Sequence, residues 1–73
     1  LIITKKHIAS VNEVEESDGA NFASLFTVAK KVAEIENLTE DGYRLTVNTG
    51  KNAGQIVPHF HMHLLGGQKL REL

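Results

Sequence analysis

Apolar positions in the first half of the 73-residue chain form a short continuous run and, further on, a helical pattern. Residues 1–4 are apolar and rich in β-branched side chains, which favours a short strand. Residues 9–19 are polar and acidic, and we expect a loop in which Ser17 or Asp18 caps the following helix. From about residue 20 to residue 37 the period is helical. The expected apolar stripe consists of Phe22, Leu25, Phe26, Ala29, Val32 and Ala33, and Asn37 is expected to end the helix in a left-handed conformation.

The second half of the chain alternates with a period of two, which is typical of half-buried strands. Residues 43–48 form one such segment, and residues 58–65 form another in which histidine alternates with an apolar residue. A polar loop joins the two segments, so we expect them to be antiparallel neighbours. The fold class predicted is α+β, an antiparallel sheet with the helix packed on one face. The helix is expected on the face of Phe60, Met62 and Leu64, which leaves the opposite face open for His59, His61 and His63.

Composition bounds the classes of protein that fit this pattern. About 41% of the residues are hydrophobic, enough for a modest core in one small domain. The formal net charge is −1, so no surface for nucleic acid or membrane is indicated. The absence of cysteine excludes a disulfide framework and a thiolate zinc site. No signal peptide or membrane span is visible, and we expect a cytoplasmic protein.

The three alternating histidines are compatible with three kinds of site. They could be surface residues on an edge strand. They could bind a metal, because neutral imidazole is a good ligand for zinc and copper. They could also support nucleophilic catalysis, with one imidazole attacking and its neighbours moving protons. The histidines alone do not separate metal binding from catalysis.

The loop that precedes the histidines favours a phosphate ligand. It runs from Asn48 to Val57 and contains Gly50 and Gly54. Glycine permits positive φ angles and close approach of the backbone to a ligand. Successive backbone N–H groups in such a loop can form an anion-binding nest. A nest beside imidazoles suits a phosphate better than a bare cation.

Together, the loop and the strand resemble the histidine triad (HIT) family, whose signature alternates three histidines with apolar residues. The residues that carry the resemblance are Gly54-Gln55-x-Val57-x-His59-x-His61-x-His63. The flanking Leu64-Leu65-Gly66-Gly67 resembles the Hint branch, because Fhit-like members usually have a proline there. Lys5-Lys6-His7-Ile8 lies where the family has a fourth histidine. The resemblance implies that residues 1–73 are the C-terminal part of a single HIT domain, with strands and a helix before them that supply much of the purine pocket.

The resemblance also implies a reaction, nucleotidyl transfer to histidine followed by hydrolysis. His61 would attack the α-phosphorus of a nucleoside phosphoramidate or a related nucleotide. The carbonyl of His59 would hold the other ring nitrogen of His61, and His63 would donate to a phosphate oxygen or the leaving group. His59 and His7 would lie behind His61 and His63, one layer further from the substrate. The phosphate would contact residues of the loop, namely Asn48, Gly54, Gln55 and Ile56, in addition to His61 and His63.

Two positions depart from the Hint pattern. Ile56 stands where serine or threonine is usual, so a hydroxyl contact is missing, and Pro58 stands where an aromatic residue is common. The resemblance implies an AMP-type purine substrate, no cofactor or metal, and a homodimer that pairs through the helix and residues 43–48. A nucleotide-binding module without turnover and a histidine-based metal-binding protein remain as alternatives.

Overall fold

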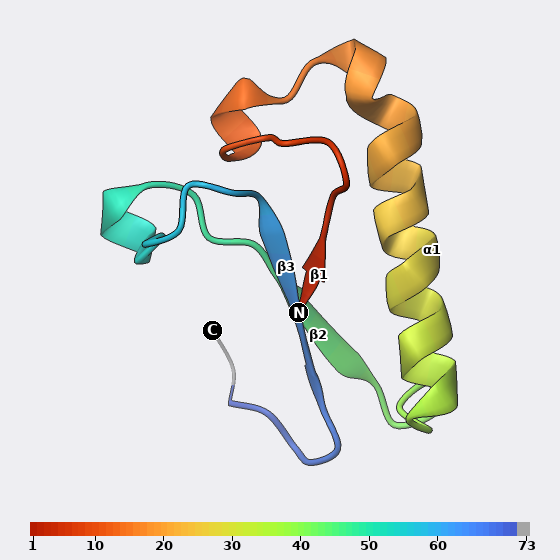
Figure 1. Ribbon diagram of the computed structural model, residues 1–73. Coiled ribbons are helices and arrows are strands. Elements are labelled where there is room, and N and C mark those ends of the chain that lie inside the picture. The colour runs from red at the N-terminus through yellow and green to blue at the C-terminus, as the bar shows by residue number, and fades with distance from the viewer. Residues whose placement is uncertain (72–73) are drawn as a thin grey trace.

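The computed structural model describes residues 1–71 and combines a three-stranded sheet with one long helix (Figure 1). The last two residues of the expected domain portion, 72 and 73, lie outside this range. The strands and helix are β1 (Ile2–Ile3), α1 (Gly19–Ile35), β2 (Tyr43–Thr46) and β3 (His61–Gly66). Short 3-10 turns occupy Val11–Glu13 (η1), Glu16–Asp18 (η2) and Lys51–Ala53 (η3).

The strand that carries His61 and His63 lies in the middle of the sheet, whose order is β1-β3-β2. Both pairings are antiparallel, which confirms the expectation for β2 and β3. Thr46 lies opposite His63 in that pair. On the other side of β3, Ile2 lies opposite Met62. The pattern at residues 1–4 predicted a strand but gave no indication that its partner lies about sixty positions downstream.

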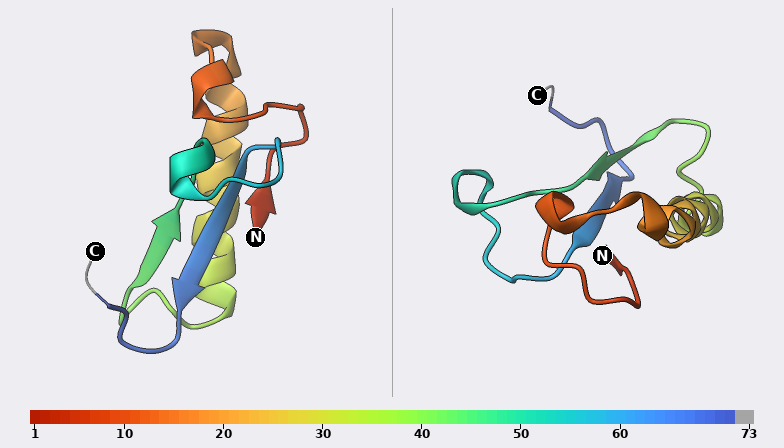
Figure 2. Two further views of the ribbon diagram at one scale, coloured as in Figure 1. Left: turned by 90° about the vertical axis from the view of Figure 1, so that its left-hand side faces the viewer. Right: turned by 90° about the horizontal axis from the view of Figure 1, so that it is seen from above.

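Helix α1 covers one face of the sheet, as the apolar stripe predicted (Figure 2). Leu25 and Ala29 from α1 form a buried cluster with Phe60 and Met62. The ring of Phe22 meets that of Phe60 edge to face, with 5.0 Å between centroids. One predicted stripe residue differs: Phe26 is 53% exposed and does not belong to the buried cluster. Within the described chain, no helix has the length and apolar character needed to cross a membrane.

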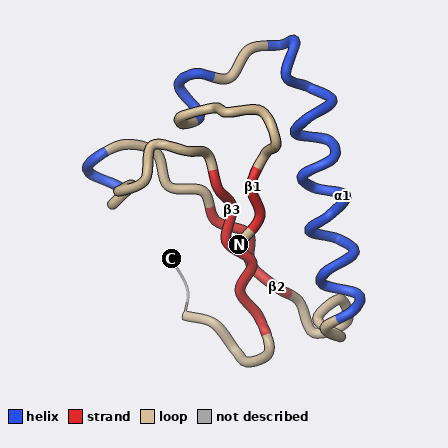
Figure 3. Tube along the Cα trace, in the orientation of Figure 1, coloured by secondary structure: helices blue, strands red, loops and turns tan. Residues whose placement is uncertain are grey.

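The histidine strand begins later than the alternation predicted, at His61 instead of residue 58. Pro58 has no N–H to donate to a neighbouring strand. The chain bends there, and the N–H of His59 donates back to the carbonyl of Val57 at 2.8 Å. His59 therefore lies just before β3. The loop between β2 and β3 and the segment after β1 meet at this end of the sheet (Figure 3).

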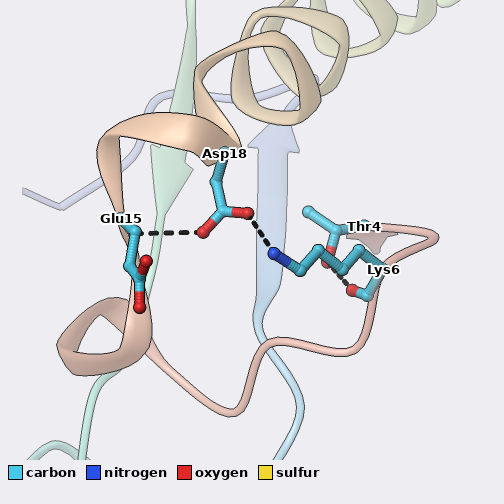
Figure 4. Close-up of polar contacts among 4 residues, drawn as sticks. All are labelled: Thr4, Lys6, Glu15 and Asp18. Carbon is cyan, nitrogen blue, oxygen red and sulfur yellow. Dashed lines mark hydrogen bonds and ion pairs between the residues drawn. The ribbon is translucent and has the colours of Figure 1, made fainter.

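The two ends of α1 differ in how well the sequence predicted them. Asn37 has a φ of 60°, the left-handed conformation expected after the helix. The next N–H, of Leu38, then returns to the carbonyl of Ala33 at 2.8 Å, closing the last turn. At the start, Asp18 occupies the capping position, but its side chain does not cap α1. That carboxylate instead accepts the Glu15 N–H and the Lys6 ammonium (Figure 4).

Candidate active site

Four histidines meet at the face of the sheet that α1 leaves open. His61 and His63 project from β3, and their rings lie edge to face with 5.1 Å between centroids. His59 lies just before the strand. His7, from the segment after β1, places its Nδ1 3.0 Å from Nδ1 of His59. The structure therefore brings together all four histidines that were predicted to belong to one site.

The ring of His61 is held so that one nitrogen stays available. Its Nδ1 lies 2.9 Å from the backbone carbonyl oxygen of His59. A carbonyl oxygen only accepts hydrogen bonds, so Nδ1 of His61 carries the proton. In the neutral ring, Nε2 then keeps its lone pair. This contact is the one that the resemblance implied, and the role of His61 as nucleophile stays a prediction.

The same reasoning assigns the ring protons of His59 and His7. Nε2 of His59 lies 3.3 Å from the carbonyl oxygen of Thr4, which can only accept. Nε2 of a neutral His59 ring is therefore the N–H donor, and its Nδ1 is an acceptor. Because that Nδ1 contacts Nδ1 of His7, the His7 nitrogen is the donor of their hydrogen bond. The two contacts of His59 thus fix the tautomers of both rings.

The glycine loop is held by hydrogen bonds within its own backbone. Gly50 and Gly54 have φ angles of 81° and 83°, which explains why glycine is suited to both positions. The N–H of Gly54 donates to the carbonyl of Lys51 at 3.1 Å, within the 3-10 turn η3. The phosphate contact expected of Gly54 stays a prediction, and it requires this hydrogen bond to be exchanged for one to the ligand. Asn48, at the start of the loop, is exposed.

The side chain of Gln55 connects the loop to its surroundings. Its Oε1 accepts the N–H of Gly50 at 2.9 Å. Its Nε2 donates to the carbonyls of Ala9 at 2.7 Å and Val57 at 3.1 Å. The amide thereby ties the loop to the segment after His7 and to the approach to His59. A phosphate-binding role for Gln55 was expected and stays a prediction; in the structure these contacts are with the protein.

An open hollow of about 450 Å³ lies in front of the imidazoles. It is lined by His59, His61 and His63 and by the apolar side chains of Leu1, Ile3 and Val57. This combination can accommodate a ligand whose reacting group faces the histidines while an apolar part lies against the aliphatic wall. Ile56, the residue that departs from the family pattern, is 90% exposed.

The arrangement of donor side chains also bears on metal binding. Among residues 1–71, no three histidine, aspartate or glutamate side chains converge in a way that could hold a metal ion. The histidine rings instead contact each other and backbone carbonyls. Four ring nitrogens take part in these hydrogen bonds: Nδ1 of His7, both nitrogens of His59 and Nδ1 of His61.

Sequence reasoning missed the contacts of the segment beside His59. Thr4 had been interpreted only as the end of a strand, Lys6 only as a flank of His7, and Asp18 as a helix cap. Asp18 is buried, and the hydrogen bond from Lys6, followed by that from the Glu15 N–H, lowers the pKa of its carboxyl from the ordinary value of 3.8. The same hydrogen bond raises the pKa of Lys6. No local pattern indicates this pair, because its members are twelve positions apart.

Comparison with known proteins identifies the family. Residues 1–70 match the HIT domain. The chain is 49% identical over 70 residues to a purine nucleoside phosphoramidase of Escherichia coli K12, and the match covers 96% of this chain and 59% of that protein. An uncharacterized HIT-like protein of Buchnera aphidicola is 35% identical over 71 residues, covering 97% of this chain and 62% of its own length.

Comparison with solved structures indicates the same family. A HIT family hydrolase from Legionella pneumophila has a TM-score of 0.91 and 46% identity, covering 94% of this chain and 62% of that one. A HIT family hydrolase from Clostridium thermocellum has a TM-score of 0.91 and 45% identity, covering 97% and 62%. The chain therefore belongs to the HIT domain family, and its fold is the HIT fold. It spans about three fifths of the length of these relatives.

Proposed function

We propose that the protein is a nucleotide-binding hydrolase, which cleaves a nucleoside 5′-monophosphate from a phosphoramidate or related leaving group through a nucleotidyl-histidine intermediate. The observation that carries the proposal is the contact between Nδ1 of His61 and the carbonyl of His59. It orients an imidazole lone pair toward the open face of the sheet. The similarity to a purine nucleoside phosphoramidase supports the substrate class.

The proposed reaction has two displacements at one phosphorus. In the first, the Nε2 lone pair of His61 forms a bond to the α-phosphorus while the bond from phosphorus to the leaving amine breaks. The amine needs a proton as it departs, and His63, the neighbouring imidazole on the same face, is the proposed donor. In the second, water attacks the phosphorus and gives its proton back to His63, the phosphorus–imidazole bond breaks, and a nucleoside monophosphate is released.

An adenosine phosphoramidate is the substrate with which to test this proposal. We expect the intact protein to release AMP and to form a transient covalent adduct on a histidine. Chelation should leave the rate unchanged, because a metal on Nε2 would occupy the lone pair needed for attack. Mass spectrometry of quenched reactions would detect the adduct, and chromatography would follow AMP release with and without chelator.

Each alternative function gives a different result in this experiment. Binding of the nucleotide with no release of AMP would support a binding module without turnover. Activity that is lost on chelation and restored by zinc would support a metal hydrolase. AMP release with no detectable adduct, under conditions that trap a phosphohistidine standard, would contradict the intermediate.

We also propose a homodimer in which α1 and the edge of β2 that no strand of residues 1–71 pairs with form a two-fold contact. Two observations support it: β2 is an outer strand of the sheet, and Ile35 on α1 is 75% exposed. Sedimentation of the intact protein at micromolar concentration should give the mass of two chains. Ile35→Lys should weaken the dimer, whereas Val11→Lys, on η1, should not. A monomer at that concentration would contradict the proposal.

A further inference from the structure

We propose that Asp18 is a positioning residue for the histidine cluster, acting through Lys6 on the segment Thr4–His7 that holds the ring of His59. The inference rests on the proposed function for its effect on rate. Its effect on the histidine rings can be measured independently of that function. Within residues 1–71, Asp18 forms hydrogen bonds with Lys6 and Glu15 and none with a histidine, so its effect on the rings is transmitted by three successive contacts.

The first contact fixes Lys6 to the start of α1. Oδ1 of Asp18 lies 2.6 Å from Nζ of Lys6, and Oδ2 accepts the N–H of Glu15 at 3.0 Å (Figure 4). Asp18 is 1% exposed, so its carboxylate has little access to water. A buried carboxylate is stable only where charged or polar partners replace its hydration. Asp18 therefore holds the ammonium of Lys6 firmly, and the lowered pKa of its carboxyl agrees with this.

The second contact closes the segment on itself. Oγ1 of Thr4 donates to the carbonyl of Lys6 at 2.8 Å, and Thr4 is 4% exposed. Lys6 is thus held at both ends, by its ammonium to Asp18 and by its carbonyl to Thr4. With these two hydrogen bonds in place, the backbone between Thr4 and His7 has one defined path along the site.

The third contact transmits that path to His59. Both ring nitrogens of His59 face the fixed segment: Nε2 lies 3.3 Å from the Thr4 carbonyl, and Nδ1 lies 3.0 Å from Nδ1 of His7. The carbonyl of His59 in turn accepts the Nδ1–H of His61. Loosening the segment would release the tautomer and orientation of His59. The backbone of His59, which carries the acceptor carbonyl, would then be held less firmly, and Nε2 of His61 would present its lone pair less often.

The test uses Asp18→Asn in the intact protein, which keeps the shape of the side chain and removes its charge. The matched control is Glu16→Gln, which removes the same charge two positions away on η2, from an exposed residue. We expect Asp18→Asn to lower kcat on the order of tenfold with KM nearly unchanged, because misplacement of reacting groups costs rate more than binding. Histidine ring 15N shifts should show a mixture of tautomers at His59. Glu16→Gln should change neither measurement.

A second pair of variants covers the case in which Asp18→Asn does not fold. The side chain of Lys6 is 57% exposed, so Lys6→Met removes the ion pair with little loss of packing, and Lys6→Arg retains it. Lys6→Met should reproduce the loss of kcat and the mixed tautomers, and Lys6→Arg should restore both. A folded variant without the ion pair but with the wild-type His59 tautomer would overturn the proposal. If the wild-type protein hydrolyses no phosphoramidate, the proposed function fails, and the ring shifts still decide the role of Asp18.

Discussion

His61→Ala is expected to abolish hydrolysis of an adenosine phosphoramidate while the nucleotide still binds. His61 is the ring whose Nδ1–H is fixed by a backbone carbonyl and whose Nε2 is left with a lone pair. Water in the space left by the imidazole is a weaker nucleophile and is not held in line. We expect kcat to fall by about a thousandfold or more, in the range seen when a catalytic nucleophile is removed.

Leu65→Ala provides the control for this experiment. Leu65 lies on the same face of β3, two positions beyond His63, and is 43% exposed. The control should keep nearly all of the wild-type activity. Binding of AMP to His61→Ala would be measured by calorimetry, which shows whether the site is still formed. Hydrolysis by this variant at even about a tenth of the wild-type rate would remove His61 from the nucleophile role, since removal of a nucleophile costs far more.

The largest effect on stability is expected at Met62. Its side chain is 2% exposed and belongs to the cluster formed with Leu25 and Ala29 of α1. Met62→Ala would leave a cavity between β3 and the helix, and such changes lower the free energy of unfolding by about 2–5 kcal/mol. Because Met62 lies between His61 and His63 in the strand, the same cavity would also loosen the support of the histidine face.

Ile56→Ala is the matched control, because it also shortens an apolar side chain, but one that is 90% exposed. Its effect on unfolding should be within about 0.5 kcal/mol, the usual range for surface positions. Urea denaturation of the intact protein, followed by circular dichroism, would give both values. Equal midpoints for the two variants would contradict the assignment of Met62 to the core.

The sequence predicted the elements whose pattern is local. The period of two at residues 58–65 predicted both the face that carries His61 and the face that carries Met62, since neighbouring side chains of a strand point in opposite directions. The helical period predicted α1, and Asn37 marked its end. The family resemblance placed His7 beside the other histidines, which no local pattern could do.

Contacts between distant segments account for what the sequence did not reveal. Asp18 was expected to cap α1 because aspartate commonly does so, but its carboxylate pairs with Lys6 instead. Strand β3 was expected to include His59, but Pro58 lacks an N–H, and the Phe60 N–H donates to the carbonyl of Ile8. In each case, a tertiary hydrogen bond outweighs a local preference. Partners of this kind depend on the path of the whole chain.

The position of β3 in the middle of the sheet has a consequence for biosynthesis. Both outer strands, β1 and β2, leave the ribosome before the strand with which each of them pairs. At translation rates of about 5–20 residues per second, β1 waits several seconds for His61 to be made. During that interval its apolar side chains can meet chaperones or other nascent chains. A product that ends before β3 would leave both outer strands without their partner in this sheet and would lack the histidines of β3. Pairing of the sheet and assembly of the histidine cluster therefore both require that β3 has been synthesised.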